Sequence, residues 1–236
     1  MKVLVAGATG ALGRQLVPRL VAAGHEVTGT TRSFGKAALL EELGARAAVL
    51  DALDPDAVAA TVAAAEPDVI VHQLTALDGV DFDPRKFEAV FAQTNRLRTE
   101  GTDHLLAAGR AVGVRRFVAQ SFTGWPFARE GGPVKTEEDP LDPAPPAAMR
   151  TTLDAIRTLE STVLDATWTE GVVLRYGGFY GPGTSLAPDG AMTEQIRRRR
   201  FPVIGDGAGV WSSAPNSAAI RSALAEQPAS LSVAGG

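Results

Sequence analysis

An apolar segment followed by three spaced glycines begins this chain and constrains its fold more than any other feature. Residues 3–6 are all apolar, and Gly7, Gly10 and Gly13 precede a helix-like stretch that starts at Arg14. In a strand–turn–helix unit, Gly7 permits the tight turn, Gly10 lets the backbone approach a pyrophosphate, and Gly13 lets helix and strand pack closely. Unpaired amides at the helix start then face the phosphate. The pattern predicts a nucleotide site; a turn that merely joins strand to helix is the alternative.

Composition restricts the class of protein. With 236 residues, 45% hydrophobic and 21% charged, the chain can bury one principal core. The absence of cysteine excludes disulfides and cysteine-ligated zinc, and His25, His72 and His104 share no metal-ligand spacing. A net charge of −4 does not favour nucleic acid as a partner. Because every apolar run falls short of the ~20 residues that a membrane span needs, we expect a cytoplasmic protein that binds neither membranes nor nucleic acid.

Strand-like and helix-like segments alternate along the chain. Apolar segments typical of strands buried on both faces lie at residues 2–6, 26–30, 47–50, 68–74, 116–120 and 171–176. Helices are predicted between them at residues 11–23, 36–43, 54–65, 86–110 and 147–166. The alternation predicts an α/β fold with a doubly wound parallel sheet of the Rossmann type. From Phe122 to Pro146 prolines and acidic residues replace this pattern, which indicates a functional lid or a mobile segment.

Together, these motifs resemble the extended and atypical branches of the short-chain dehydrogenase/reductase superfamily, specifically the NAD-dependent epimerase/dehydratase group. The resemblance runs along almost the whole chain up to Trp211. It is carried by residues 7–13, 51–54, 69–72, 74–76, 94–95, 100–102, 117–121 and 174–183. The cofactor-binding residues that it implies are Gly7, Thr9, Gly10, Ala11, Leu12, Gly13, Asp51, Ala52, Leu74, Thr75, Ala76, Asn95 and Tyr176.

The end of the second predicted strand favours NADP over NAD. An NAD site usually carries Asp or Glu at this point to hold the ribose hydroxyls, whereas this chain reads Thr30-Thr31-Arg32-Ser33. The guanidinium of Arg32 has the charge and geometry to bind the 2′-phosphate of NADP. We expect NADP as the cofactor, with NAD as the alternative; in the competing interpretation Arg32 is a solvated surface residue.

The catalytic pair that the resemblance implies is missing. Members of the superfamily use a tyrosine as general acid/base and a lysine four residues later on the same helical face. Neither Tyr176 nor Tyr180, the two tyrosines of this chain, has a lysine four residues later. Alignment of the predicted helix by Glu160 puts Thr152 at the tyrosine position and Ile156 at the lysine position; a helix shifted by a few residues would place Met149 and Leu153 there, which are no better suited. Because threonine barely ionises and isoleucine carries no charge, the usual proton relay is absent.

Three functions stay open. The first is an atypical NAD(P)(H)-dependent oxidoreductase or epimerase/dehydratase-like enzyme with nonstandard catalysis, acting on a small carbonyl or sugar-like substrate. The others are a lyase or cyclase on the same fold and a non-catalytic NADP(H)-binding sensor or regulatory protein. Ser121, where the family keeps its catalytic serine, and Tyr180 are the candidate catalytic residues. A serine that caps its own loop and a structural Tyr180 are the competing interpretations; His72 is interpreted as a core histidine.

The C-terminal part departs from the family pattern. Residues 201–207 and 209–211 still resemble the family, but an Ala-rich segment predicted to be helical, residues 217–226, follows where a substrate-binding subdomain is expected. We therefore expect a Rossmann domain at residues 1–176 and a reduced substrate-side region at residues 177–236, packed on the same domain.

Two further expectations concern partners. Four consecutive arginines at residues 197–200 have the geometry to bind a substrate phosphate, but a solvated helix end, with cations favourably placed against the dipole, is the preferred interpretation. The expected partners are a small-molecule substrate and a second copy of the chain in a homodimer.

Overall fold

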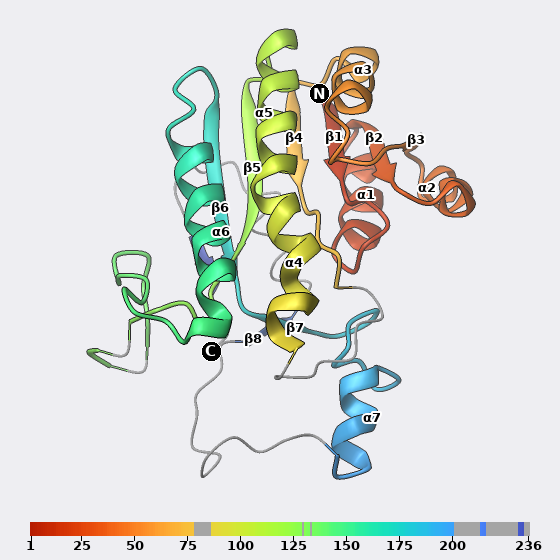
Figure 1. Ribbon diagram of the computed structural model, residues 1–236. Helices are drawn as coiled ribbons and strands as arrows, with labels where there is room; N and C mark the ends of the chain where they lie inside the picture. Colours follow the sequence, from red (N-terminus) through yellow and green to blue (C-terminus); the bar gives the residue numbers. More distant parts are fainter. Residues whose placement is uncertain (78–85, 129, 133, 201–212, 216–230, 234–236) are drawn as a thin grey trace.

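The computed structural model describes residues 1–77, 86–128, 130–132, 134–200, 213–215 and 231–233 (Figure 1). The main sheet contains β1 (Lys2–Ala6), β2 (Glu26–Thr31), β3 (Arg46–Val49), β4 (Val69–His72), β5 (Arg116–Phe122), β6 (Glu170–Tyr176) and β9 (Leu231–Val233). The helices are α1 (Gly13–Ala22), η1 (Phe34–Lys36), α2 (Ala37–Glu42), α3 (Pro55–Ala65), α4 (Phe87–Arg98), α5 (Glu100–Val112), α6 (Ala147–Leu164) and α7 (Ala191–Arg197). A separate two-stranded sheet pairs β7 (Gly178–Tyr180) with β8 (Ser213–Pro215).

The strand order of the main sheet is β3-β2-β1-β4-β5-β6-β9, and all its neighbouring strands are parallel. The predicted doubly wound Rossmann sheet is therefore confirmed. The order reverses between β1 and β4, and ligands of such folds bind outside the carboxyl ends of the strands at this switch point. Strand β9 was not predicted. The helix predicted at residues 217–226 and the family-like segments at residues 201–207 and 209–211 lie outside the described residues.

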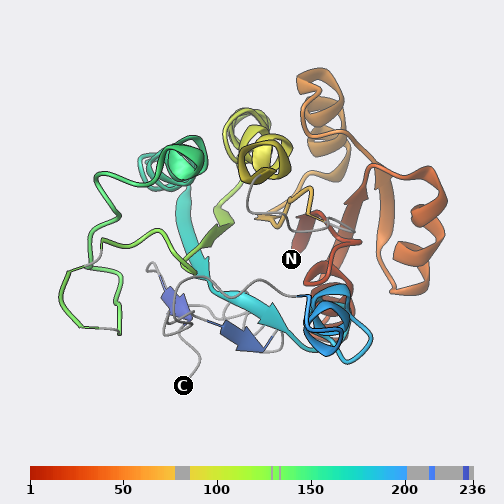
Figure 2. The same cartoon turned by 60° about the horizontal axis from the view of Figure 1, so that its bottom comes forward.

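Helices cover both faces of the sheet (Figure 2). On one face, α3, α4, α5 and α6 bury an apolar cluster that includes Val62, Leu97, Leu105 and Leu159. On the other face, α1 and α2 bury a second cluster around Leu16. Burial of each such side chain contributes roughly 1.5–3 kcal/mol. Apolar alternation along the strands thus produces the two buried layers that hold the strand ends in place.

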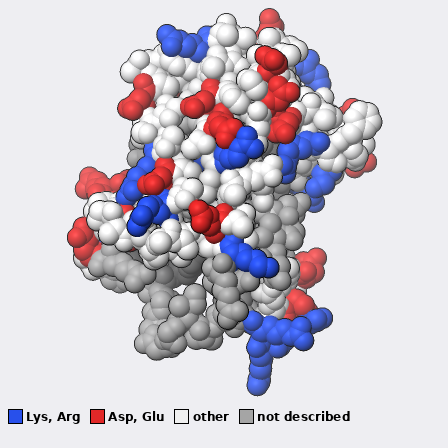
Figure 3. Space-filling model, in the orientation of Figure 1, with Lys and Arg blue, Asp and Glu red and all other residues white. Residues whose placement is uncertain are grey.

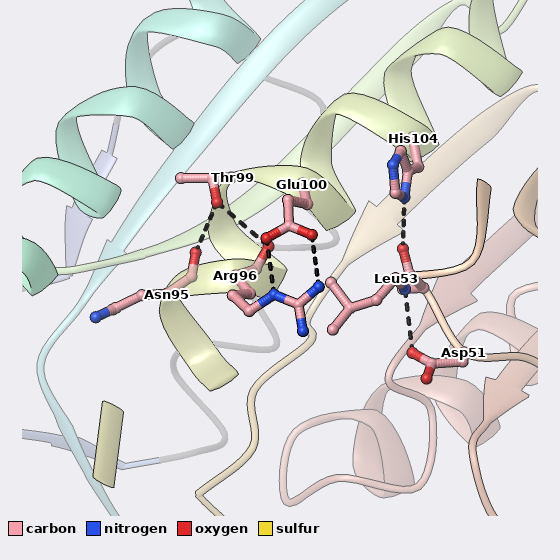
Figure 4. A network of polar contacts seen from close by, with 8 residues as sticks. Asp51, Leu53, Asn95, Arg96, Thr99, Glu100 and His104 are labelled. Carbon is pink, nitrogen blue, oxygen red and sulfur yellow. Dashed lines mark hydrogen bonds and ion pairs between the residues drawn. The ribbon is translucent and has the colours of Figure 1, made fainter. Parts of the chain in front are cut away.

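The single long helix predicted at residues 86–110 is wrong, because the chain bends at Thr99 between α4 and α5. Thr99 has φ −94° and ψ −83°, and its hydroxyl donates back to the carbonyl oxygens of Asn95 at 3.1 Å and Arg96 at 3.4 Å (Figure 4). Such local bonds compete with the helical pattern and often bend helices. An ion pair across the bend joins Arg96 to Glu100, with two contacts of 2.7 Å. The bend places the end of α4 beside the carboxyl ends of the strands.

The proline-rich segment after β5 contains no helix or strand in its described part, as the sequence predicts. It folds back on itself through an antiparallel bridge between Phe127 and Leu141. Arg157 of α6 fastens it to the body of the protein by donating a hydrogen bond of 2.5 Å to the carbonyl oxygen of Asp142. The segment is thus attached beside α6.

Charged side chains of both signs are interspersed on the face shown in Figure 3. The basic end of α7 is exposed: Arg198 pairs with Glu194 at 2.6 Å, and Arg197 donates to the Pro188 oxygen at 2.9 Å. This placement agrees with the interpretation of a solvated helix end. Within the described ranges, no helix has the length and apolarity that crossing a membrane requires.

Candidate active site

The glycine-rich turn joins β1 to α1. Gly7 has a φ of +88°, and a Cβ on it would come within 2.8 Å of the backbone oxygen of Gln73. A Cβ on Gly13 would lie 2.5 Å from the backbone oxygen of Ala8, so glycine is required where α1 packs on the turn. At Gly10 an added Cβ would meet only a backbone oxygen of the turn, at 3.3 Å. The outer side of Gly10 is therefore open to a ligand.

The first amides of α1 are available to an anion. The helical hydrogen bonds begin at Arg14, whose N–H donates to the Gly10 oxygen at 3.1 Å. Among the described residues, no acceptor is recorded for the amides of residues 11–13. The first turn carries no acidic side chain, and a helix N-terminus attracts negative charge. The turn thus fits the pyrophosphate of a dinucleotide. Residues 9–13 would hold this pyrophosphate.

The end of β2 lies directly against this turn. The amide of Gly7 donates to the hydroxyl of Thr30 at 3.3 Å, and the amide of Ala8 donates to the Thr30 carbonyl at 3.1 Å. The hydroxyl of Thr9 donates to that of Thr31 at 3.3 Å. Arg32, the next residue, is exposed and makes no hydrogen bond or ion pair with any residue in the described ranges. Its guanidinium is free for a phosphate at this corner.

Asp51 and Ala52 form the turn after β3 (Figure 4). The exposed carboxylate of Asp51 accepts the amide of Leu53 at 3.0 Å. Nδ1 of His104 in α5 lies 3.0 Å from the carbonyl oxygen of Ala52, and because a carbonyl only accepts, Nδ1 carries the proton. This bond fixes the turn to α5, so Asp51 and Ala52, which the sequence predicts to bind the cofactor, have a defined position.

His72 at the end of β4 is a satisfied core residue. Its Nδ1 accepts the amide of Leu74 at 3.2 Å, so Nε2 carries the proton and donates to the hydroxyl of Thr102 at 3.1 Å. Burial lowers the pKa of His72 to about 4. The ring is neutral at pH 7 and both nitrogens are engaged, as the sequence interpretation expects.

The segment after β4 lies at the switch point. Leu74 and Ala76 are half-buried and Thr75 is exposed, and the amide of Ala76 donates to the hydroxyl of Thr94 at 3.0 Å. Asn95, in contrast, is buried, and its side-chain amide donates to Thr152, so its contacts lie inside the protein. The cofactor contacts predicted for Leu74, Thr75 and Ala76 thus concern residues at the switch point, whereas the Asn95 side chain is bonded to Thr152.

Ser121, Glu160 and Arg175 form a buried network. The Ser121 hydroxyl donates to Oε1 of Glu160 at 2.5 Å. Arg175 binds both oxygens of the same carboxylate, from Nε at 2.9 Å and from Nη2 at 2.7 Å. Ser121 and Arg175 are register partners on β5 and β6, and Glu160 reaches them from α6. The partner of Ser121 is therefore a helix carboxylate, and the interpretation that this serine caps its own loop is wrong.

The α6 face that points at this network carries the two replaced positions. Thr152, Ile156 and Glu160 are spaced by four residues and share one helical face, and all three are buried. Oγ1 of Thr152 accepts a hydrogen bond from Nδ2 of Asn95 at 3.0 Å. This face contains one ionisable group, the Glu160 carboxylate.

Neither tyrosine belongs to this network: Tyr176 packs on the other face of the main sheet, and Tyr180 lies on the separate two-stranded sheet. Tyr176 is fully buried in the core cluster of α1 and α2, beside the Phe179 ring at 5.3 Å between centroids, and burial raises its phenol pKa. A cofactor contact by Tyr176 would therefore have to use its backbone. Tyr180 is 46% exposed on β7 and pairs with Pro215. The described contacts do not join it to Ser121.

Sequence reasoning missed the two arginines of the site. Arg175 interrupts an apolar strand, which was a usable signal for a buried ion pair. Arg98 stands among polar residues at the end of α4, where no sequence pattern distinguishes it from exposed arginines. In the described part of the chain, no cluster of three or more His, Asp or Glu could hold a metal ion.

Comparisons with known proteins identify relatives of this chain. A 3-diazoavenalumate denitrifying reductase from a Streptomyces species is 45% identical over 226 residues, which cover 95% of this chain and 71% of that protein. A dTDP-4-dehydrorhamnose reductase from Streptomyces griseus is 32% identical over 183 residues, covering 76% of this chain. The chain spans 50% of the length of this second relative.

Structural comparison and family matching agree. The UDP-glucose 4-epimerase of Thermus thermophilus, solved in complex with NAD, has the same fold, with a TM-score of 0.77 at 23% identity over 100% of this chain and 78% of that chain. The family model described as NAD dependent epimerase/dehydratase family matches residues 3–211. The chain belongs to the NAD dependent epimerase/dehydratase family.

Proposed function

We propose that this chain is a reductase that uses NAD(P)H to replace a diazonium group of its substrate by hydrogen, with release of N₂. One observation carries the proposal: α6 contains neither tyrosine nor lysine, the pair that the family resemblance predicts on this helix, and Thr152 and Ile156 are buried on it instead. The relative that is 45% identical is named a denitrifying reductase of a diazo compound. Both point to reduction without the usual proton relay.

The two candidate reactions differ in their need for a proton. Carbonyl reduction adds a hydride to carbon and a proton to oxygen. A diazonium carbon needs only the hydride, which reduced nicotinamide supplies when bound. The carbon–nitrogen bond breaks, a carbon–hydrogen bond forms and N₂ leaves, so R–N₂⁺ and H⁻ give R–H and N₂. Atoms, electrons and charge balance without a proton from the protein.

The side chains near the carboxyl ends of β4, β5 and β6 support this choice. The Ser121 hydroxyl donates a hydrogen bond to Glu160, and Arg175 keeps that carboxylate paired. Tyr176 lies in the core on the opposite face with a raised pKa. These groups hold the strand ends rigid while offering no ready acid to a carbonyl oxygen. A small carbonyl or sugar-like substrate is therefore the less favoured candidate.

The cofactor assignment follows from the glycine-rich turn and from Arg32. In this proposal residues 1–176 form the cofactor-binding domain and residues 177–236 the substrate-side region. NADP(H) is preferred over NAD(H) because β2 ends without a carboxylate and leaves the Arg32 guanidinium unpaired within the described ranges.

The proposal is tested with diazotised 4-aminobenzoate and NADPH or NADH deuterated at the transferring carbon. The expected products are N₂, oxidised cofactor and benzoate carrying one deuterium where nitrogen was attached. Reactions without protein and with Gly10→Val, whose added side chain obstructs the open side of the turn, correct for direct chemical reduction. A ketone panel that includes dTDP-4-dehydrorhamnose is measured alongside.

Two other outcomes would overturn the proposal, and each would assign a different function. Cofactor consumption with ketones and none above background with the diazo compound would assign carbonyl reduction. Tight NADPH binding with no consumption on either panel would assign a non-catalytic binder.

A further inference from the structure

Arg98, the last residue of α4, is a buried cation without a carboxylate partner. Its exposed fraction is 6%. Its one hydrogen bond among the described residues runs from Nη1 to Oδ1 of Asn95, at 3.4 Å. No ion pair within 4 Å joins it to a carboxylate in the described ranges. A buried charge without a counter-charge is costly unless something else compensates it.

The nearest described carboxylate is already neutralised. Burial lowers the pKa of Arg98 to about 10, while the charge of Glu160 acts in the opposite direction. Glu160 is held by both donors of Arg175 at 2.9 Å and 2.7 Å. Together, Arg98, Glu160 and Arg175 therefore carry one net positive charge inside the fold.

Two hydrogen bonds and one electrostatic interaction locate this charge at the candidate active site. Arg98 bonds to Asn95, and Asn95 bonds in turn to Thr152 on the α6 face described above. The charge of Arg98 also acts on His72 at the carboxyl end of β4. The guanidinium thus lies among α4, α6 and the ends of β4 and β5, where ligands of this fold bind. The glycine-rich turn, in contrast, lies at β1 and α1.

We propose that Arg98 forms an anion subsite that binds the acidic group of the substrate, so that the substrate is an organic acid anion. A guanidinium presents a planar fork that matches a carboxylate, and the incoming anion supplies the missing counter-charge. This inference deepens the proposed function: the reacting substrate becomes a diazo compound that carries a carboxylate. The bent end of α4 at Thr99 holds the guanidinium at the strand ends.

The first test needs no turnover. Benzoate and its neutral analogue benzamide are titrated by calorimetry into the NADP⁺-loaded protein. Benzoate is expected to bind about tenfold or more tightly than benzamide, because one charge-assisted contact is worth about that factor. Equal affinities, or no benzoate binding to the unaltered protein, would overturn the subsite.

Variants assign the effect to Arg98. Arg98→Met is expected to weaken benzoate binding about tenfold or more. Arg98→Lys is expected to retain part of the benzoate affinity. In both variants the dissociation constant for NADPH is expected to stay unchanged. Arg110→Met is the matched control, because Arg110 is an exposed arginine in the last turn of α5, away from the bend at Thr99. A loss of NADPH affinity in place of benzoate affinity would assign Arg98 to the cofactor and overturn the proposal.

The subsite and the diazo chemistry fail separately. Arg98-dependent benzoate binding without turnover of the diazonium carboxylate would refute the reaction alone. Turnover whose KM is unchanged in both Arg98 variants would refute the subsite alone. If Arg98→Met does not fold, Arg98→Lys and the benzoate–benzamide comparison on the unaltered protein still decide the question.

Discussion

Replacing Arg175 by methionine isolates a buried carboxylate and tests whether the network at Ser121 stabilises the fold. In the unaltered protein, Arg175 and Glu160 are 14% and 9% exposed at their side chains and share two hydrogen bonds. Arg175→Met keeps an unbranched chain of similar size but leaves Ser121 as the one hydrogen-bond donor to Glu160 among the described contacts. The substitution also removes the contact of the guanidinium with the Phe127 ring, 5.7 Å from its centroid.

The magnitude follows from burial. Removal of one partner of a buried ion pair costs about 3–5 kcal/mol, because the remaining charge stays in a poorly solvated place. For a chain of this size that corresponds to a fall in Tm of roughly 6–20 °C. The comparison pair is Arg116–Glu170, which joins β5 to β6 at 2.8 Å but is 28% and 37% exposed. Arg116→Met should cost about 1 kcal/mol or less.

The assay is urea unfolding of the four proteins of a double-mutant cycle at pH 7. Glu160→Gln combined with Arg175→Met should recover much of the stability lost in Arg175→Met, because the amide removes the unpaired charge and still accepts from Ser121. The reasoning is refuted if Arg175→Met costs no more free energy of unfolding than Arg116→Met, or if the double variant is as unstable as the sum of the two single variants.

Three shorter predictions concern the cofactor site and the core. Arg32→Ala should raise the dissociation constant for NADPH about 10-fold to 100-fold and leave that for NADH almost unchanged; calorimetry checks this, and equal losses would remove the 2′-phosphate assignment. Gly10→Val should abolish binding of both cofactors in a protein that still unfolds cooperatively, and unchanged affinity would contradict the phosphate cradle. Because the folded pKa of His72, about 4, lies below its ordinary 6.5, the unfolded chain binds more protons between these values. Stability should therefore fall as pH drops from about 6.5 to about 4, by up to about 1.4 kcal/mol per pH unit. His72→Gln should flatten this slope in urea midpoints, and an unchanged slope would mean that other groups cause it.

Local signals account for what could be predicted of the site. The glycine-rich turn is a short-range feature, because the φ of Gly7 and the close approach at Gly13 are set within one strand–turn–helix unit. The placement of Arg32 after β2 follows from the same short unit. The hydrogen-bond partner of Ser121, in contrast, comes from a helix 39 residues later in the chain. Neither periodicity nor spacing in the sequence indicated that Ser121 would bind Glu160 and not a group of its own loop.

The sequence alone determined the alternating elements, the parallel Rossmann sheet, the nucleotide-binding turn and the loss of the tyrosine–lysine pair. These depend on apolar periodicity, on glycine backbone freedom and on residue identity, all of which are readable along the chain. Tertiary structure decided the bend at Thr99, the burial of Tyr176 and the pairing of Glu160 with Arg175. It also left Arg98 as the unpaired buried charge among the described residues. Whether a charge is paired depends on which segments, distant in the sequence, lie next to it in the fold. The linear sequence does not give the distances between such segments.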